Sequence, residues 1–186
     1  LPVPVSGLTG VTALGTGMGN TCAIGAGGEV WCWGDNGHGQ LGDGTTTASS
    51  VPVQVTGITD AVDVSSSLGG HTCAVRLGGE VSCWGRNEFG ELGRGDSGAD
   101  VLAPVDVASL TDAATISVGN YSACSARTDG SVVCWGENSK GQLGDGTTND
   151  SETFVSVLGV SGAEQVAVGA RSACALVGVN PGTGGS

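Results

Sequence analysis

The chain has 186 residues, 36 of them glycine, and its 18 acidic residues outnumber 6 basic ones to give a formal net charge of −12. That charge disfavours binding to nucleic-acid phosphates and anionic membranes, and no apolar run is long enough for a membrane-spanning helix. We therefore expect no nucleic-acid partner and no membrane insertion. Abundant Val, Thr, Ser and Gly, with few strong helix formers, favour strands and tight turns, so the predicted class is all-β.

The chain opens with a strand-like segment, Leu1-Pro2-Val3-Pro4-Val5. After it the sequence repeats about every 51 residues. The dipeptide Trp-Gly starts at Trp33, Trp84 and Trp135, and each copy leads into a related phrase: DNGHGQLGDG, RNEFGELGRG or ENSKGQLGDG. Three copies in register indicate a tandem repeat. In chain order we predict a lone outer strand (1–7), three full repeats (8–57, 58–109 and 110–159), a half repeat (160–177) and a Gly-rich tail (178–186).

Each full repeat predicts four short strands, named A to D. Glycine-containing tight turns join strands B and C as a β-hairpin, and the long C–D connection carries the repeated phrase. The half repeat has strands A and B and then lacks the Trp-Gly strand C. Four-stranded units of this length are typical of β-propeller blades. In the second repeat we expect strands at Ala61–Ser65, Thr72–Leu77, Glu80–Trp84 and Ala103–Val107.

The repeated phrase also points to a family. The pattern WGxNxxGQLGxG follows a CAV…GGEV-type hairpin and precedes a P-V-x-V strand, and it resembles the regulator of chromosome condensation repeat over residues 1 to about 177. The resemblance implies a β-propeller, because members of that family commonly form rings of about seven four-stranded antiparallel blades. This chain contains about three and a half blades, so the resemblance implies a partial or oligomer-completed propeller.

Glycine, leucine and tryptophan have structural explanations within the repeat. The glycines suit positive φ angles in a folded-back loop. We expect the repeated leucines to fix each loop on its blade and the tryptophans to fill the gaps between blades, at Leu41, Leu92, Leu143, Trp33, Trp84 and Trp135.

Six of the seven cysteines form pairs ten residues apart across the B–C hairpins: Cys22 and Cys32, Cys73 and Cys83, and Cys124 and Cys134. Folding each hairpin about its turn places the two cysteines opposite each other, within reach of a disulfide. A zinc site would need clustered cysteines or nearby histidines, and the chain has only two histidines. Three disulfides are the favoured interpretation, with free thiols and metal binding as alternatives. Disulfides persist in oxidising compartments, which predicts an extracellular, secreted or cell-surface protein.

Cys174 has no such partner, because the position ten residues later is Gly184. We therefore expect Cys174 to be unpaired or to bond between molecules. Three interpretations of the half repeat stay open. The chain is part of a longer propeller; or chains complete one another by strand addition, with residues 1–6 of one joining the open blade of the next; or the chain is a compact four-bladed monomer with an incomplete last blade.

No motif supports catalysis or a cofactor. The segment Gly95-Asp96-Ser97-Gly98 resembles the nucleophile phrase of trypsin-like proteases, but it lies in a loop and no histidine has the context of a catalytic base. The recurring Asp43, Asp96 and Asp145 suit weak calcium binding or, more simply, turns. We expect no enzyme activity, no cofactor and no metal site.

Positions that differ between repeats are the candidates for partner binding, because a scaffold residue should recur and a binding residue need not. The A–B and C–D loops emerge at the same end of a blade and carry aromatic, Met and Arg residues of the kind enriched in protein interfaces. Isolated exposed residues of this kind are also ordinary. The candidates are Met18, Trp31, His38, His71, Phe89, Tyr121 and Arg171, and Trp31 would otherwise pack between blades.

The sequence thus predicts a non-catalytic extracellular module that binds or scaffolds proteins. One alternative is a structural subunit of an extracellular assembly or filament, joined by strand complementation between open blade edges. Another is a secreted enzyme inhibitor of the propeller type. Each implies a protein partner or self-association as a homo-oligomer or polymer.

Overall fold

The structure is a computed structural model that describes residue 5 and residues 7–178. Its regular elements are strands alone, arranged as three four-stranded antiparallel sheets and one two-stranded sheet. This confirms the predicted fold class, a partial β-propeller of about three and a half blades. The expected lone strand at residues 1–7 and tail at 178–186 lie mostly outside the described residues, and no helix in the described part has the length and apolar character needed to cross a bilayer.

Blades 1 to 3 each consist of four consecutive strands, and blade 4 has two. Blade 1 contains β1 (Ala13–Thr16), β2 (Asn20–Ile24), β3 (Val30–Gly34) and β4 (Ser49–Gln54). Blade 2 contains β5 (Ala61–Ser66), β6 (His71–Arg76), β7 (Val81–Gly85) and β8 (Val101–Asp106). Blade 3 contains β9 (Ala113–Val118), β10 (Ser122–Arg127), β11 (Val132–Gly136) and β12 (Ser151–Ser156). Blade 4 contains β13 (Ala163–Val168) and β14 (Ala173–Val177).

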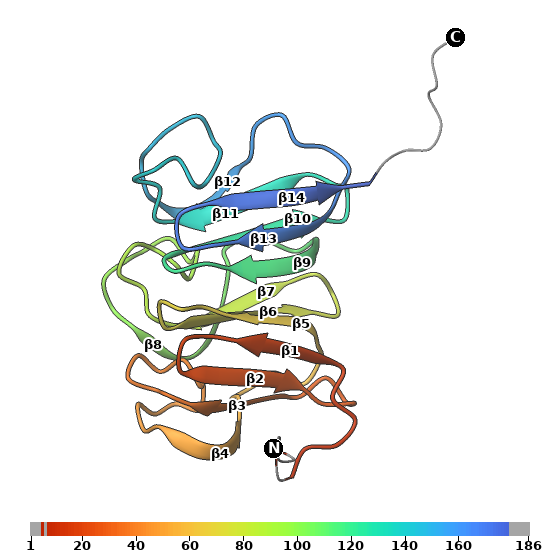
Figure 1. The fold of residues 1–186 in the computed structure, drawn as a ribbon, viewed down its shortest axis with the longest axis vertical. Coiled ribbons are helices and arrows are strands. Elements are labelled where there is room, and N and C mark those ends of the chain that lie inside the picture. The colour runs from red at the N-terminus through yellow and green to blue at the C-terminus, as the bar shows by residue number, and fades with distance from the viewer. Residues whose placement is uncertain (1–4, 6, 179–186) are drawn as a thin grey trace.

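The blades stack face to face in chain order, as Figure 1 shows. The first strands of successive blades contact one another along the stack. Apolar side chains fill the spaces between sheets rather than the interior of any one sheet. Between blades 1 and 2, for example, Ile24, Val30 and Leu41 of blade 1 pack with Val64 and Trp84 of blade 2. Each blade therefore depends on its neighbours for its core, as in other repeat architectures.

The cysteine pairs staple the central hairpin of each complete blade. The strand register places Cys22 opposite Cys32, and the same relation holds in the other two complete blades. The structure contains all three predicted disulfides, Cys22–Cys32, Cys73–Cys83 and Cys124–Cys134, with Cα atoms 4.0 to 4.1 Å apart. All six sulfurs lie in the cores between blades. Cys174 is exposed and has no disulfide partner among the described residues.

The glycine of each Trp-Gly dipeptide ends the third strand, where the backbone has a positive φ and passes close to the A–B turn. The ladder between β3 and β4 shifts register between Cys32 and Gly34, and Gly34 has φ of 108°. A Cβ atom at Gly34 would lie 2.1 Å from the carbonyl oxygen of Gly19. A larger residue would therefore collide with the neighbouring turn and strain the backbone.

The repeated loop phrase holds itself together by side-chain hydrogen bonds. In blade 1, Asn36 Oδ1 accepts the backbone N–H of Leu41 at 2.9 Å, and Gln40 Oε1 accepts the N–H of His38 at 2.8 Å. The equivalent bonds recur in blades 2 and 3. The side chain of the repeated leucine is buried in all three loops. This explains why Asn, Gln or Glu, and Leu recur at fixed spacing.

Candidate functional site

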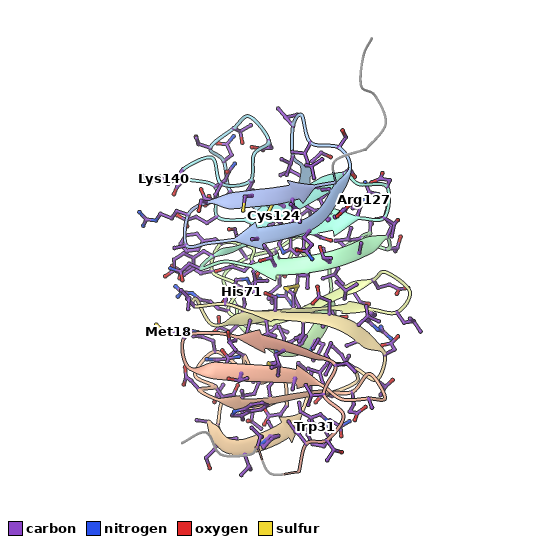
Figure 2. All side chains as sticks on the ribbon, turned by 45° about the vertical axis from the view of Figure 1, so that its right-hand side comes forward. Met18, Trp31, His71, Cys124, Arg127 and Lys140 are labelled. Atoms are coloured by element: carbon purple, nitrogen blue, oxygen red, sulfur yellow. A yellow bond between two sulfur atoms is a disulfide. The ribbon has the colours of Figure 1, made fainter. Side chains whose placement is uncertain are left out.

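The A–B turns and the C–D loops emerge together along one side of the stack, which we call the loop face. It comprises the turns β1–β2, β5–β6, β9–β10 and β13–β14 and the loops β3–β4, β7–β8 and β11–β12. In Figure 2, Met18 and Lys140 lie on this side, and Arg127 of a B–C hairpin lies on the opposite side. The expected placement of these loops is therefore confirmed.

A hollow of about 580 Å³ crosses the loop face over blades 1 to 3. Two large apolar side chains stand at its rim, since Met18 is 81% exposed and Leu68 is 56% exposed. The hollow is lined by Met18, Asn20, Asp35, His38, Gln40, Leu68, Arg86, Asn120 and Tyr121, together with nearby glycines and a serine. The lining joins apolar, aromatic, cationic and amide groups, a mixture suited to protein recognition.

An aromatic and cationic cluster connects blades 2 and 3 at this hollow. The guanidinium carbon of Arg86 lies 4.8 Å from the centroid of the Tyr121 ring. The ring of Phe89 meets Tyr121 edge-on, with centroids 5.4 Å apart. Arg86 also forms an ion pair with Glu88. Because each of these side chains is held by another, their positions are set before any partner arrives.

His38 adds a contact between blades 1 and 2. Its Nδ1 lies 2.8 Å from Oδ2 of Asp100, and the histidine side chain is 43% exposed. This pair fixes the β3–β4 loop against the segment before β8. Four of the predicted candidates, Met18, His38, Phe89 and Tyr121, are thus brought together in or beside one hollow.

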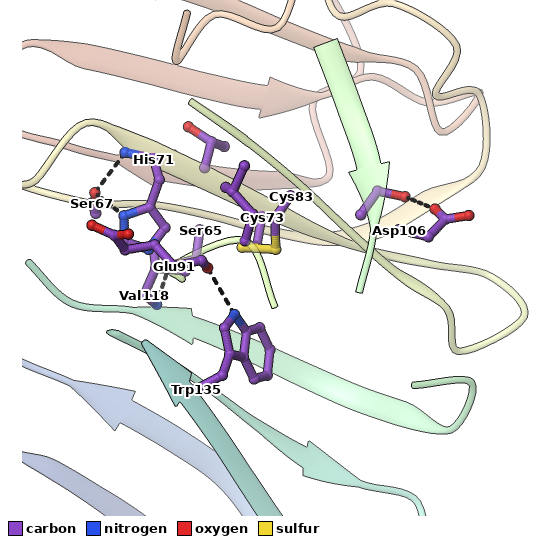
Figure 3. Close-up of a disulfide and its surroundings, with 12 residues drawn as sticks. Ser65, Ser67, His71, Cys73, Cys83, Glu91, Asp106, Val118 and Trp135 are labelled. Atoms are coloured by element: carbon purple, nitrogen blue, oxygen red, sulfur yellow. Dashed lines mark hydrogen bonds between the residues drawn. A yellow bond between two sulfur atoms is a disulfide. The ribbon is translucent and has the colours of Figure 1, made fainter. Parts of the chain in front are cut away.

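His71 is not on the surface, which corrects the expectation that it is presented to a partner. Its side chain is fully buried at the start of β6, and Nδ1 lies 3.0 Å from the hydroxyl of Ser67 (Figure 3). Burial, with a smaller contribution from the charge of Arg86, lowers the pKa of His71 to about 3. Its Nε2 has no hydrogen-bond partner in the described part. His71 is a neutral core residue below the hollow.

Glu91 is a second buried titratable group in this region. It occupies the position of Gln40 in blade 1 and is fully buried, and desolvation raises the pKa of its carboxyl group. Its Oε2 accepts the N–H of Phe89 at 2.7 Å, and its backbone oxygen accepts the indole N–H of Trp135 at 2.8 Å (Figure 3). Glu91 therefore positions the Phe89 loop and holds blade 3 against blade 2.

Two other candidates lie away from the hollow. Trp31 is a partly exposed residue of β3, in register with Ala23 and Gln54, within the sheet rather than on the loop face. Arg171 is exposed on the β13–β14 turn, where it borders a separate cavity beside β14 with Lys140. Neither contributes to the hollow over blades 1 to 3.

The residues with apparent catalytic or metal-binding context have structural contacts instead. Ser97 donates its hydroxyl hydrogen to Glu152 at 2.6 Å. Asp43 and Asp145 each accept hydrogen bonds from an asparagine and a threonine within their own loops. Among residues 5 and 7–178, no group of three or more His, Cys, Asp or Glu side chains is arranged to hold a metal ion.

Comparison with known proteins identifies the repeat. The model of the regulator of chromosome condensation (RCC1) repeat matches residues 27–75, 78–125 and 129–176, more than half of the chain. The chain belongs to the RCC1 repeat family. A second model of the same repeat matches residues 11–40, 61–91 and 113–142.

RCC1-repeat relatives share the sequence at moderate identity. The chain is 34% identical to the human E3 ubiquitin-protein ligase HERC2 over 140 residues, covering 74% of this chain and 3% of that protein. It is 31% identical over 177 residues to the mitochondrial RCC1 domain-containing protein RUG3 of Arabidopsis thaliana, covering 89% of this chain and 40% of that protein. The RCC1 repeats of this chain thus span less than half the length of these relatives.

Solved structures share the fold, among them two of yeast RCC1 (Prp20). The structure of Kap60 bound to yeast RCC1 (Prp20) matches with a TM-score of 0.80 and 20% identity, over 94% of this chain and 43% of that chain. The structure of Prp20p from Saccharomyces cerevisiae, a protein described as binding Gsp1p and histones, matches with a TM-score of 0.78 and 16% identity, over 91% of this chain and 44% of that chain. The ectodomain of the Arabidopsis thaliana receptor kinase ACR4 matches with a TM-score of 0.50 and 19% identity, over 90% and 45%.

Leu68 was missing from the candidates predicted from the RCC1-repeat sequence. It is an apolar residue in a Ser- and Gly-rich turn, and it occupies the turn of blade 2 that corresponds to the turn of Met18 in blade 1. Comparing turn tips between repeats would have found it. Arg86 follows the second Trp-Gly directly, where blades 1 and 3 have Asp35 and Glu137. That reversal of charge distinguishes Arg86 from its equivalents and is the sequence feature that marks it as a candidate for the contact with Tyr121.

Proposed function

We propose that this chain is a non-catalytic extracellular module that binds a protein partner through the loop face. The main support for this proposal is the hollow of about 580 Å³. It is lined by residues of three blades that differ between repeats, on an otherwise repetitive scaffold. Met18 and Leu68 supply exposed apolar area, and the Arg86–Tyr121 contact supplies a rigid, partly polar anchor. Tyr, Arg and Met are enriched in such interfaces.

The RCC1-repeat relationship supports a role in protein binding. The solved structures with this fold include yeast RCC1 (Prp20) bound to Kap60 and the same protein described as binding Gsp1p and histones. Those partners belong to those proteins. A histone-like basic partner would also suit the acidic composition of this chain, but the apolar rim of the hollow favours a partner with an apolar protrusion.

Three disulfides support the extracellular location. Disulfides of this structural kind are rare in reducing compartments and common in secreted proteins. Fractionating the producing cells and analysing the natural protein by non-reducing mass spectrometry tests this. We expect the oxidised protein in the secreted or surface fraction, whereas reduced thiols in a cytosolic fraction would refute the location.

Affinity capture tests the loop face. The immobilised full chain is compared with the triple variant Met18→Ser, Leu68→Ser, Tyr121→Ala and with the control Leu77→Ser. Leu77 is 77% exposed on a B–C turn on the opposite side, so its replacement removes an exposed leucine outside the loop face. The probe is the secreted and surface proteome of the producing organism. We expect a partner that the chain and the control retain and that the triple variant binds at least tenfold more weakly; equal binding by all three would place the contact elsewhere.

A further inference from the structure

Arg86 is a cation where the other complete blades have an acid. It follows the second Trp-Gly dipeptide, and the residues in the same position of blades 1 and 3 are Asp35 and Glu137. The chain carries a formal net charge of −12, so most of its surface repels acidic groups. Within the lining of the hollow, the positive charge of Arg86 balances the negative charge of Asp35. The hollow is therefore much less negative than the molecule as a whole.

The guanidinium group of Arg86 is held in place and still has unused hydrogen-bond donors. A guanidinium group presents five N–H donors in one plane. Nη2 of Arg86 donates to Glu88, and the ring of Tyr121 lies against one face of the group, 4.8 Å from its central carbon. Neither contact occupies the N–H groups of Nε and Nη1. The side chain is 23% exposed and lines the hollow, so a carboxylate there can bind Arg86 without displacing either neighbour.

The other charged and polar groups of the lining are engaged within the protein. Oδ2 of Asp35, the acidic residue of the lining, accepts a hydrogen bond from Nε2 of Gln40 at 2.9 Å. Nδ1 of His38 lies 2.8 Å from Oδ2 of Asp100. A partner's cation would therefore meet an acid that already has a hydrogen-bond donor, whereas a partner's carboxylate would meet free charged donors on Arg86. Because hydrogen bonds between ionised groups are the stronger ones, the hollow favours an anionic group.

Exposed apolar side chains share the hollow with this cation. Met18 is 81% exposed and Leu68 is 56% exposed, and both line the hollow. Covering them with an apolar group of a partner removes apolar surface from water. The flexible thioether of Met18 can adapt to the shape of that group, and the ring of Tyr121 supplies a rigid wall. The hollow thus combines apolar area and a charged anchor in one site of about 580 Å³.

We propose that the hollow binds a protein segment in which an acidic residue lies close in sequence to a large apolar residue. The carboxylate of the acidic residue accepts N–H groups of Arg86, and the apolar side chain covers Met18 and Leu68. Arginine suits this role because its planar donors match the two oxygens of a carboxylate. The inference rests on the proposed function, since it names the chemistry of the partner that the loop face binds.

Arg86 also fixes the register of such a segment. Exposed charges act on one another over about 8 Å at physiological ionic strength. A carboxylate that misses Arg86 meets the acidic groups in and around the hollow, which belong to Asp35, Glu88 and Asp100. Like charges brought together cost free energy, so a shifted segment binds less tightly. Arg86 is therefore the specificity-determining residue of the hollow, because it accepts an acid at one point of a surface that repels acids elsewhere.

Peptide display on the intact chain tests this recognition. A phage library of random peptides is selected on the immobilised wild type, on Arg86→Gln, on the double variant Met18→Ser, Leu68→Ser and on the control Arg94→Gln, after circular dichroism has shown that all are folded. Arg94 lies in the same C–D loop and also pairs with an acid two positions later, but it does not line the hollow. We expect the wild type and the control to enrich peptides with Asp or Glu within about four positions of a large apolar residue, a span of about 13 Å in an extended chain. The enrichment should be at least threefold over the unselected library, and Arg86→Gln should lose the preference for the acid.

Reversing the charge of Arg86 gives a second test. Arg86→Glu installs the residue type of blade 3 and should change the selected peptides from acidic to basic. If Arg86→Gln and Arg86→Glu select the same acidic peptides as the wild type, while the double variant Met18→Ser, Leu68→Ser selects none, the loop face binds proteins but the role of Arg86 is overturned. If the wild type enriches nothing beyond what the double variant enriches, the proposed function itself is contradicted, and this inference with it.

Discussion

Blades 2 and 4 begin with the same hairpin but differ in what surrounds it. The register of β13 with β14 matches that of β5 with β6. The first five residues of β6 are all buried, whereas four of the five residues of β14 are exposed. The sequences of the two strands do not explain this contrast. Burial is conferred by the third and fourth strands and by the next blade, as expected of a stack in which each unit shares its core with its neighbours.

Blade 1, at the other end of the stack, shows the same dependence of burial on a neighbouring blade. Trp33 occupies the position of Trp84 and Trp135, which are fully buried, yet Trp33 is partly exposed because no described blade precedes it. The contrast between closed joints and open ends therefore makes quantitative predictions for equivalent residues.

The largest expected difference lies in the tryptophans. Trp84→Ala should lower the free energy of unfolding by about 3–5 kcal/mol, since it removes a buried ring and its hydrogen bond. Trp33→Ala should cost less, about 1–2 kcal/mol, because part of its surface already meets solvent. Urea denaturation followed by circular dichroism measures both. Similar losses would show that a tryptophan is equally important at a closed joint and at an open end.

The cysteines give the next largest contrast. Replacing both Cys73 and Cys83 by alanine should cost about 3 kcal/mol, because the disulfide closes a ten-residue separation inside a core. Cys174→Ala should change stability by no more than about 0.5 kcal/mol, since this residue is exposed. Denaturation without reductant compares the variants. A cost for Cys174→Ala near that of the double variant would contradict the comparison.

The buried histidine predicts acid sensitivity of the central blades. The folded pKa of His71 is about 3, below its ordinary value of 6.5, so the unfolded chain binds an extra proton between these pH values. This group therefore stabilises the fold less as pH falls below 6.5. Between pH 7 and 5 its contribution should fall by about 2 kcal/mol. His71→Asn, which places the residue of blade 1 at this position, should remove that decline in urea midpoints.

Protonation of Glu91 has the opposite effect on the free energy of unfolding, so this residue serves as the control. Its pKa is raised by burial, so its protonation favours the folded state as pH falls towards the ordinary glutamate range. Glu91→Gln, which installs the residue of the other two blades, should therefore steepen the acid decline, and adding His71→Asn should flatten it. An unchanged slope in His71→Asn would show that this histidine does not cause the acid sensitivity.

The repeat pattern determined most of the fold in advance. The spacing of Cys73 and Cys83 fixes the hairpin register, because a shift of one residue would turn one sulfur to the other face. The strands predicted for blade 2 begin and end within two residues of the observed ones, and the disulfides agree. These features depend on contacts within a repeat, which the sequence shows directly.

The candidate site was predicted less completely, because it depends on contacts between repeats. His71 sits where β6 begins rather than at the turn tip, and the equivalent Asn20 and Ser122 are also buried. Comparing the three positions as a strand start would have revealed this. Arg171 lies at the cavity beside β14, away from Tyr121, because each blade advances its loops along the stack. The separation of these two residues depends on how the blades stack, which the sequence of a single repeat does not show.

The smallest expected effect concerns a pair of equivalent aliphatic residues. Leu14 lies opposite Ala23 as Val64 lies opposite Ala74, so both occupy the same position of their blades. Leu14 is 63% exposed and Val64 is 3% exposed. Leu14→Ala should change stability by about 0.5 kcal/mol or less, although it removes more atoms than Val64→Ala, which should cost about 2 kcal/mol. Urea midpoints measured side by side decide the matter: if the leucine proved the more costly of the two, burial by the adjacent blade would not be the source of stability at this position.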